Sequence, residues 1–424
     1  MEKSFDGDKK IEEIKLFLSA QGIDPDVFLA AFSRYREKGR RYIRLTDLHS
    51  EEALDILKKD FEGNLKALNC FPSVFSLPRE LKINEKESYI SRSIQGIDIG
   101  SIFAVHALDA QPGENVLEMC AAPGTKMIYI SDLRSKWTGK LFANDFSEYR
   151  IQVMKSLLES FGKKDVVVLN KDARTLSLKD LQEELERSNS TNQHPLVEKE
   201  TPGLINEEGS PENSNAFQHQ KDELTNEVNK IPAKELTLHK ILVDVECTHD
   251  GSFKHLLKYV TSSELSSKKQ KSDPGNPISN REAKRRAKQL QSRQNKNSKE
   301  EFDCRMSDPK AYSELLSLQS SILSNGLRLL SIGGTLVYST CSFCEAQNEK
   351  TVSSCVESFN ELSKAEGVKI ELVDLRPLVS EELKSLGFGA GSVPQTVRLY
   401  PDRSDCGAFF VAKMKKIHTE PFSA

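Results

Sequence analysis

The sequence predicts an α/β fold, in which an open sheet of mainly parallel strands follows a small α+β domain. An apolar run at residues 115–119 ends in small residues, a proline and a glycine, and a helical pattern comes next. Two later apolar runs each lead to an aspartate, and a fourth leads to Asp244. Open α/β sheets bind ligands at the carboxyl ends of their strands, so the residues after these runs form the candidate site.

Residues 1–100 are predicted to form a separate N-terminal region. Apolar residues at helical spacing, a run that alternates basic with apolar residues as in an edge strand, and then a helix with short strands predict an α+β domain. These elements are expected at residues 11–20, 25–35, 40–45, 51–60 and 65–77. The basic residues of this region are Arg34, Arg36, Arg40, Arg41 and Arg44. They are consistent with a surface that docks nucleic acid and equally with a solvated basic surface.

The strand at residues 115–119 is the centre of the predicted sheet. A helix at residues 102–110 and a Pro-Gly turn precede it. Small residues with Pro123 and Gly124 follow it, and then a helical pattern over residues 127–133. Small side chains let a ligand approach the backbone, and amides at the helix start face that ligand. The turn lacks a Gly-x-Gly-x-x-Gly motif, which favours a nucleoside smaller than a dinucleotide.

Aspartates follow the next two predicted strands. The strand at residues 139–143 ends at Asp145, 21 residues after Gly124, and the strand at residues 165–169 leads to Asp172. An acidic residue about 20 positions after such a turn commonly binds the hydroxyls of a ribose. The alternative is that each carboxylate only caps the next helix.

Two cysteines follow two later strands. A strand at residues 240–243 should lie beside the first strand, where the strand order reverses, so that Asp244 and Cys247 emerge at the ligand crevice. After a long helix, a strand at residues 335–339 leads to Cys341. Two thiols at neighbouring strand ends are unexpected if each only packs as a small apolar residue.

The cysteine spacing favours a nucleophile over a metal site. Cys341 and Cys344 form one Cys-x-x-Cys pair, but no second pair follows at zinc-ligand spacing, and Cys355 and Cys406 are isolated. We therefore expect no metal ion, and a nucleophilic cysteine fits better than a redox dithiol.

Composition indicates a soluble, intracellular protein in the nucleus or cytoplasm, not a secreted one. The chain has 424 residues, eight cysteines and a net charge of −3. A secretory signal and an apolar run of membrane-spanning length are both lacking in this sequence.

Two segments are predicted to be disordered insertions, at about residues 187–232 and 262–300. The first is rich in Asn, Glu, Ser and Pro. The second contains the basic stretch Lys268–Lys299, with Arg285 and Arg286 at its centre. This stretch is interpreted as an arm that binds phosphates, a nuclear import signal or a solvated linker.

Several motifs, in this order, resemble the Sun-type RNA cytosine-5 methyltransferases of the RsmB/Nop/Sun superfamily. The small-residue loop before Lys126 and the Tyr-Ser-Thr-Cys-Ser strand end are the most specific. The matching residues are Cys120–Lys126, Asn144–Ser147, Arg150, Asp172, Asp244–Cys247, Val337–Ser342, Gln347–Glu349, Arg398, Pro401 and Gly407–Phe410. The resemblance covers about residues 97–415 without the insertions and implies a methyltransferase domain over residues 101–416, with a tail at residues 417–424.

The resemblance implies a Rossmann-like, S-adenosylmethionine-dependent fold with a seven-stranded sheet. The loop would wrap the methionine end of the cofactor, Asp145 would bind its ribose, Asp172 would lie near its adenine, and Asp244 would face cofactor and base. The implied cofactor-binding residues are Cys120, Ala121, Ala122, Pro123, Gly124, Thr125, Lys126, Asp145, Arg150, Asp172 and Asp244. Cys341 matches the nucleophile of the family, and Cys247 matches its second cysteine, which helps to release the product.

The chemistry explains these residue types. Carbon 5 of cytosine becomes nucleophilic when a thiolate adds to carbon 6. By resemblance, Cys341 adds, a protonated Asp244 stabilises the adduct at ring nitrogen 3, and Cys247 or a water removes the proton of carbon 5. The implied substrate is structured RNA, with tRNA expected, ribosomal RNA as the alternative and a monomer as the expected state. A catalytically impaired RNA-binding protein with the same fold is the competing hypothesis.

The sequence departs from the family near these residues. Glu246 precedes Cys247 where proline is usual, and its charge is expected to disfavour the thiolate of Cys247. Thr125 stands where a second glycine is common, and Cys344-Glu345 replaces a common Asn-Pro. The segment Thr248–Ser252 is also unusual, and together these departures mark a divergent branch.

Overall fold

The computed structural model describes residues 5–133, 138–191, 236–257, 308–404 and 406–419. Most of both predicted insertions, including Lys268–Lys299, lies outside the described residues. The expected start of the first insertion at Arg187 is wrong, because α8 (Leu178–Thr191) continues to Thr191 and Arg187 pairs with Glu184 across one turn. Helix α8 belongs to a different unit from the other described helices and strands.

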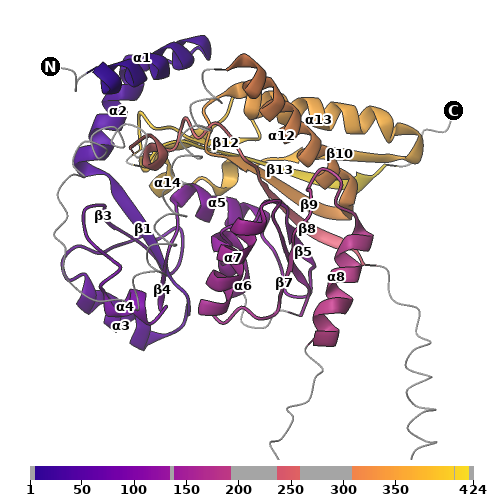
Figure 1. Ribbon diagram of the computed structural model, residues 1–424, viewed down its shortest axis with the longest axis horizontal. Coiled ribbons are helices and arrows are strands. Elements are labelled where there is room, and N and C mark those ends of the chain that lie inside the picture. The colour runs from indigo at the N-terminus through magenta and orange to yellow at the C-terminus, as the bar shows by residue number, and fades with distance from the viewer. Residues whose placement is uncertain (1–4, 134–137, 192–235, 258–307, 405, 420–424) are drawn as a thin grey trace, which may run out of the picture. The chain divides into compact units, whose positions relative to one another are not determined.

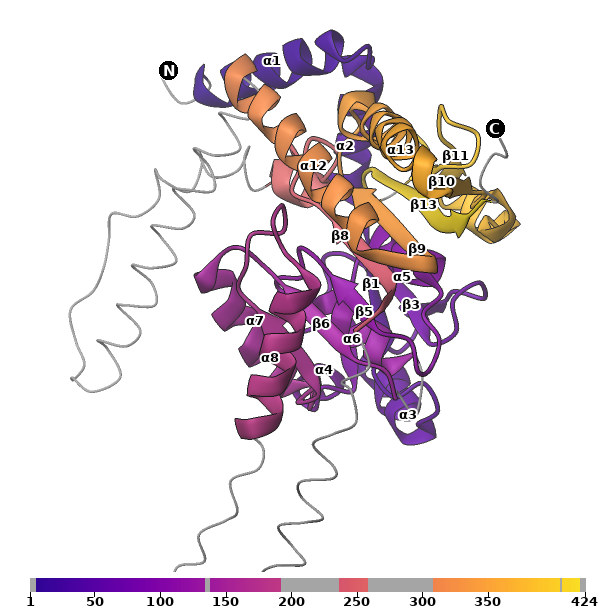
Figure 2. The ribbon, with the colours of Figure 1, turned by 90° about the vertical axis from the view of Figure 1, so that its right-hand side faces the viewer.

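The larger sheet has nine strands among the described residues, in the order β11-β12-β13-β9-β8-β5-β6-β7, with β10 paired to β13 (Figures 1 and 2). These strands are β5 (Val116–Glu118), β6 (Leu141–Asn144), β7 (Val166–Leu169), β8 (Leu238–Asp244), β9 (Leu330–Thr340), β10 (Val368–Val373), β11 (Phe388–Ala390), β12 (Val397–Leu399) and β13 (Phe409–His418). β7-β6-β5-β8-β9 are parallel, and the pairings of β13 are antiparallel.

Seven of these strands match the sheet that the resemblance implies, and a hairpin adds two. The hairpin β11-β12 pairs with β13 through Phe409–Val411, whereas β10 pairs with β13 through Lys413–His418 and Val373–Val368. The ten-residue β13 is long enough to hold both neighbours along one side.

The strand order reverses at β5, which positions the candidate site. The chain runs from β5 outward through β6 to β7 and returns to β8 on the other side of β5. β5 and β8 pair in parallel, with Val116 opposite Lys240, which confirms the predicted neighbours. Ligand crevices of open α/β sheets form at such a reversal, beyond the carboxyl ends of the strands.

Helices cover both faces of this sheet (Figures 1 and 2). On one face α5 (Ile99–Leu108), α6 (Thr125–Asp132) and α7 (Glu148–Ser160) share one apolar core with Leu242 and Val337. On the other face α12 (Pro309–Leu329) packs against β8, β9 and α13 (Glu349–Leu362). Buried parallel strands need this double cover. None of the described helices is long and apolar enough to cross a membrane.

The remaining elements of this part are short. They are the helix α14 (Glu381–Ser385) and the 3₁₀ turns η1 (Glu345–Gln347), η2 (Lys364–Glu366) and η3 (Arg376–Leu378).

The N-terminal region is an α+β domain, as predicted, with an antiparallel sheet in the order β2-β3-β1-β4. Its elements are α1 (Phe5–Ala20), α2 (Pro25–Lys38), β1 (Arg40–Leu45), α3 (Glu51–Asp60), β2 (Lys66–Ala67), β3 (Val74–Pro78), α4 (Glu87–Ile90) and β4 (Ile94–Gly96). The prediction that β1 is an edge strand is wrong, since β1 lies between β3 and β4. Its last four residues are buried, which an exposed edge does not provide.

Helix α2 packs against the segment that follows Cys247. The rings of Phe28, Phe32 and Tyr35 lie 5.6, 5.6 and 5.3 Å from the ring of Phe253. Because Phe253 is fully buried there, the N-terminal region supports one wall of the candidate site.

Arg44 is a buried connection between the N-terminal sheet and helix α6 rather than part of a basic surface. Its guanidinium forms an ion pair with Asp132 at 2.6 Å, donates to Gln95 at 2.8 Å and lies 4.5 Å from the Tyr129 ring centre. The prediction of an exposed Arg44 is therefore wrong. The side chain of Arg34 is also engaged, since it donates to the carbonyl of Asp402 at 2.6 Å.

Replacement of Arg44 by alanine is expected to lower the free energy of unfolding by about 3 kcal/mol or more, because the change breaks a buried ion pair. Urea unfolding followed by circular dichroism measures this change. The control is Arg36→Ala, on the exposed side of α2, which should change the stability by less than about 0.5 kcal/mol. An Arg44→Ala variant as stable as the parent would contradict this role.

Candidate functional site

A cavity of about 1140 Å³ lies at the carboxyl ends of β5, β8 and β9. Of the site residues predicted from the sequence, all line this cavity except Gly124: they are Cys120, Ala121, Ala122, Pro123, Thr125, Lys126, Asp145, Arg150, Asp172, Asp244, Cys247 and Cys341. Residues that follow five strands, β5 to β9, thus meet at one opening.

The loop after β5 forms one wall of the cavity. Its backbone is tied to the next strand, since the amide of Ala121 donates to the carbonyl of Asn144 at 2.7 Å. Gly124 adopts φ +98° immediately before α6, a conformation that other residues rarely adopt. A β-carbon at this position would also lie 3.0 Å from Met154, so glycine serves the turn without lining the cavity.

Asp145 is fixed by this loop. Its carboxylate accepts hydrogen bonds from the amides of Ala122 at 3.2 Å and Ser147 at 3.1 Å, and it lies 3.3 Å from Arg150. The Arg150 guanidinium also donates to the carbonyl of Ala122 at 2.6 Å. Next in the chain, Phe146 lines the cavity with a ring that is 75% exposed. The sequence interpretation included Phe146 in the motif Asn144–Ser147 but gave it no role, although an aromatic residue beside a strand-end aspartate was a visible signal.

Asp172 lines the cavity and pairs with Arg174. The guanidinium binds both carboxylate oxygens, at 3.0 and 2.6 Å, and these hydrogen bonds lower the pKa of Asp172. Asp172 is therefore held as a carboxylate at the cavity.

Asp244 is held between a cation and a hydroxyl. Its carboxylate forms an ion pair with Lys126 and accepts a hydrogen bond from Ser339 at 2.6 Å. These contacts place the ammonium of Lys126 and the hydroxyl of Ser339 against the carboxylate of Asp244. The role of Asp244 at the base stays a prediction. Beside them, burial raises the pKa of Glu118 to about 8.

The thiols of Cys247 and Cys341 lie 3.3 Å apart. The imidazole of His249 is in contact with both sulfurs, since Nδ1 is 3.1 Å from Cys341 Sγ and 3.7 Å from Cys247 Sγ. His249 is a functional candidate that the sequence interpretation missed. The signal for it was the unusual segment after Cys247, but only the loop conformation turns the ring towards the sulfurs.

The contact between the sulfurs separates the two thiol pKa values. A hydrogen bond with Cys341, together with His249, lowers the pKa of Cys247 well below its ordinary value. The same contact and burial raise the pKa of Cys341. The expectation that Glu246 disfavours a thiolate at Cys247 stays a prediction.

Cys247, His249 and Cys341 have ligand atoms within 4.8 Å of one another, the one such group of three in the described residues. A tetrahedral zinc ion with Zn–S bonds of about 2.3 Å separates two sulfurs by about 3.8 Å. The observed separation is 3.3 Å, and the group offers three ligands where a structural zinc site uses four, so the expectation of no metal ion stays a prediction.

A polar network behind the cavity holds the two cysteine loops together. The side-chain amide of Gln347 accepts from the Thr248 amide at 3.1 Å and donates to the Thr248 hydroxyl at 2.9 Å. The amide of Gly251 donates to the carbonyl of Cys341 at 3.1 Å. Gln347 therefore connects the segment of Cys247 to the turn that follows Cys341.

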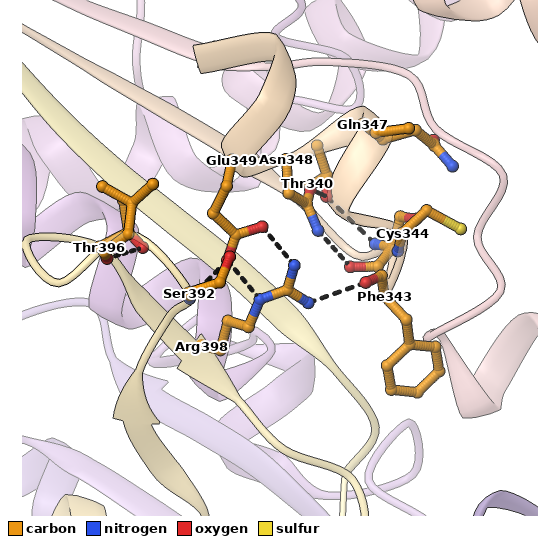
Figure 3. A network of polar contacts seen from close by, with 12 residues as sticks. Thr340, Phe343, Cys344, Gln347, Asn348, Glu349, Ser392, Thr396 and Arg398 are labelled. Atoms are coloured by element: carbon orange, nitrogen blue, oxygen red, sulfur yellow. Dashed lines mark hydrogen bonds and ion pairs between the residues drawn. The ribbon is translucent and has the colours of Figure 1, made fainter. Parts of the chain in front are cut away.

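Glu349 and Arg398 close this network on the β9 side (Figure 3). The Arg398 guanidinium is paired with the Glu349 carboxylate and donates to the carbonyl of Phe343 at 2.8 Å. Asn348 donates to the carbonyl of Ser342 at 2.9 Å and accepts from Thr340 at 2.6 Å. The Gln-Asn-Glu motif thus fixes the turn that carries Cys341.

Comparison with known proteins identifies the family. The family model described as 16S rRNA methyltransferase RsmB/F matches residues 105–188 and 295–415. A multisite-specific tRNA (cytosine-C5) methyltransferase of Schizosaccharomyces pombe is 25% identical over 75% of this chain and 41% of its own length. A tRNA (cytosine(49)-C5) methyltransferase of Pyrococcus abyssi is 31% identical over 23% of this chain and 30% of its own. The chain thus spans less than half the length of either relative.

Solved structures support the fold. The crystal structure of NSun6 from Pyrococcus horikoshii with SFG has a TM-score of 0.56 at 15% identity, and the match covers 96% of this chain and 97% of that chain. A methyltransferase homologue from the same organism has a TM-score of 0.51 at 20% identity, and the match covers 95% of this chain and 98% of the homologue. The chain belongs to the RsmB/F family of S-adenosylmethionine-dependent RNA cytosine-C5 methyltransferases, the family that the Sun-type motifs predicted.

Proposed function

We propose that this chain transfers a methyl group from S-adenosylmethionine to carbon 5 of a cytosine in structured RNA, through a covalent bond between Cys341 and the base. The observation that carries this proposal is the 3.3 Å contact between Cys247 and Cys341 in the cavity that the loop after β5 also lines. In this arrangement Cys341 can add to carbon 6 of the base while Cys247 lies beside carbon 5.

The cavity residues fit the proposed cofactor. Asp145, Asp172 and Asp244 bring carboxylates to the cavity, which suits a ligand with ribose hydroxyls and a sulfonium charge. Asp145 and the exposed ring of Phe146 would bind the nucleoside, and the loop from Cys120 to Lys126 would hold the methionine part. When bound, S-adenosylmethionine supplies an electrophilic methyl group.

The protein side chains would carry the remaining steps. The thiolate of Cys341 forms a bond to carbon 6, which places an electron pair at carbon 5 for attack on the methyl group. Lys126, paired with Asp244, stabilises the charge that develops towards ring nitrogen 3. Cys247 then takes the proton of carbon 5, the ring double bond re-forms, and the electron pair of the sulfur–carbon bond returns to Cys341.

We propose tRNA as the substrate. The match to the S. pombe tRNA methyltransferase covers 75% of this chain, whereas the match to a 25S rRNA (cytosine-C5) methyltransferase of that organism covers 18%. The base must leave its stack to reach thiols that lie inside a cavity, which favours a loop or an end of a folded RNA. The N-terminal region, where Arg36 is exposed, is the proposed RNA-docking part.

The main test incubates the chain with radiolabelled S-adenosylmethionine and unmodified tRNA, and in parallel with ribosomal RNA fragments. Label in 5-methylcytosine after nuclease digestion of the tRNA is the expected result, and Cys341→Ala is the matched inactive control. Label only in ribosomal RNA would overturn the tRNA assignment. Cofactor binding without any label in cytosine would support the non-catalytic hypothesis instead.

The two cysteines should give opposite covalent outcomes. Cys247→Ala is expected to accumulate a protein–RNA adduct, because proton removal from carbon 5 is blocked after the bond has formed. Cys341→Ala should form no adduct. Denaturing gel electrophoresis with labelled RNA distinguishes the variants, with Cys355→Ser, a buried thiol on α13, as the control. Full activity in Cys341→Ala would remove it as the nucleophile.

Asp145→Asn is expected to weaken binding of S-adenosylmethionine about tenfold, since hydrogen bonds to a charged acceptor are stronger by about 1 kcal/mol or more. Isothermal titration calorimetry measures the dissociation constant. Asp165→Asn, an exposed residue before β7, is the control and should bind like the parent. Equal binding by both variants would argue against a ribose contact at Asp145.

A further inference from the structure

His249 touches the proposed nucleophile, and the steps above give it no role. We propose that His249 is the general base that accepts the proton of Cys341 and so generates the attacking thiolate. This inference rests on the proposed function in one respect, namely that Cys341 is the nucleophile. The resemblance assigned no residue to this task.

The position of the imidazole supports this role. Nδ1 lies 3.1 Å from Cys341 Sγ, which is hydrogen-bonding distance for a thiol, and it is closer to Cys341 than to Cys247, at 3.7 Å. His249 is thus placed to exchange a proton with Cys341 directly.

The ring is fixed in place by its surroundings. The backbone of His249 has φ +56°, a conformation that is uncommon for a residue other than glycine. The ring stacks on His255 with centres 4.5 Å apart and planes at 20°, and Ser252 holds His255 at 2.7 Å. The preceding residue, Thr248, is buried and bound to Gln347. An unusual backbone held by this many contacts indicates a functional constraint on the ring.

The charges around Cys341 require a cation if it is to ionise. The contact with Cys247, burial and the carboxylates of Asp244 and Asp250 all raise the pKa of Cys341. The imidazole of His249, which stacks on that of His255, lies against both thiols. The ammonium of Lys126 is already paired with Asp244. An imidazolium at His249 would offset these negative charges, because an opposite charge at such a distance lowers a thiol pKa by about 1–3 units.

The proton balance is simple. The proton moves from Cys341 Sγ to His249 Nδ1, which leaves a thiolate beside an imidazolium. The sulfur electron pair forms the bond to carbon 6 and returns to the sulfur when that bond breaks at the end of the cycle. Cys247 receives the separate proton from carbon 5, so each proton has one acceptor.

The test measures thiol ionisation without RNA or cofactor. In a Cys247→Ala background, the rate at which iodoacetamide alkylates Cys341 is followed from pH 5.5 to 9 by mass spectrometry of its peptide. With His249 present, the reaction should proceed at pH 6.5 at least tenfold faster than with His249→Ala or His249→Asn. Both variants should shift the inflection to about 8.5 or above, the value of an ordinary thiol.

The controls separate this role from a structural one. His49→Ala removes an exposed histidine of the N-terminal region and should leave the profile unchanged. Thermal unfolding shows whether the His249 variants fold, and His249→Asn retains a polar side chain that cannot take up the proton. An unchanged alkylation profile in a folded His249→Asn variant overturns the inference.

A second measurement connects the inference to turnover. In the chain that keeps both cysteines, His249→Asn should lower the methyl-transfer rate about 100-fold or more. The acidic limb of the pH–rate profile should move to higher pH. A wild-type profile in this variant would also overturn the inference. Because alkylation needs no RNA, a chain that transfers no methyl group would refute the proposed function and still leave the role of His249 measurable.

Discussion

The contact between Cys247 and Cys341 is the constraint on which the site depends. Both residues follow neighbouring parallel strands, and the pairing of Asp244 with Ser339 brings the ends of β8 and β9 into register. Strand pairing alone leaves the two loops free beyond that point. Hydrogen bonds hold the two loops together beyond the strands. Gln347 bonds to Thr248, and the amide of Gly251 donates to the Cys341 carbonyl, so that the two sulfurs lie in contact. Reactive groups held in this way need little reorganisation before the chemical step.

Charge placement divides the cavity into two functional parts. At the loop after β5, Asp145 and Arg150 lie together beside the backbone that would cradle the cofactor. At the end of β8, Lys126 neutralises Asp244, and burial keeps Glu118 largely protonated near neutral pH. The thiol pair follows β8 and β9, and burial of Cys247 strengthens its electrostatic contacts. Different side chains therefore serve cofactor binding and activation of the cytosine.

Much of this arrangement could be predicted from the sequence, because strand ends have a clear local signature. The apolar run before Cys120, the aspartates after β6 and β7, and the two cysteine-bearing strand ends are each visible within about ten residues of sequence. Arg44 was misassigned to the surface since charged residues are rarely buried, and its partner Asp132 lies 88 positions away. His249 was missed for a related reason. Its left-handed backbone conformation turns the ring towards the sulfurs, and no local sequence pattern predicts that conformation. The Gln-Asn-Glu motif was recognised, but its role depends on a partner 99 positions away.

The most direct test of the central claim uses RNA in which the target cytidine carries fluorine at carbon 5. Fluorine cannot leave as a proton, so the bond between sulfur and carbon 6 persists once it has formed. After digestion, mass spectrometry should find the nucleotide attached to the peptide that contains Cys341, and the attachment should require S-adenosylmethionine. Attachment at Cys247, or a cofactor-bound chain that forms no covalent product with any RNA offered, would contradict the account.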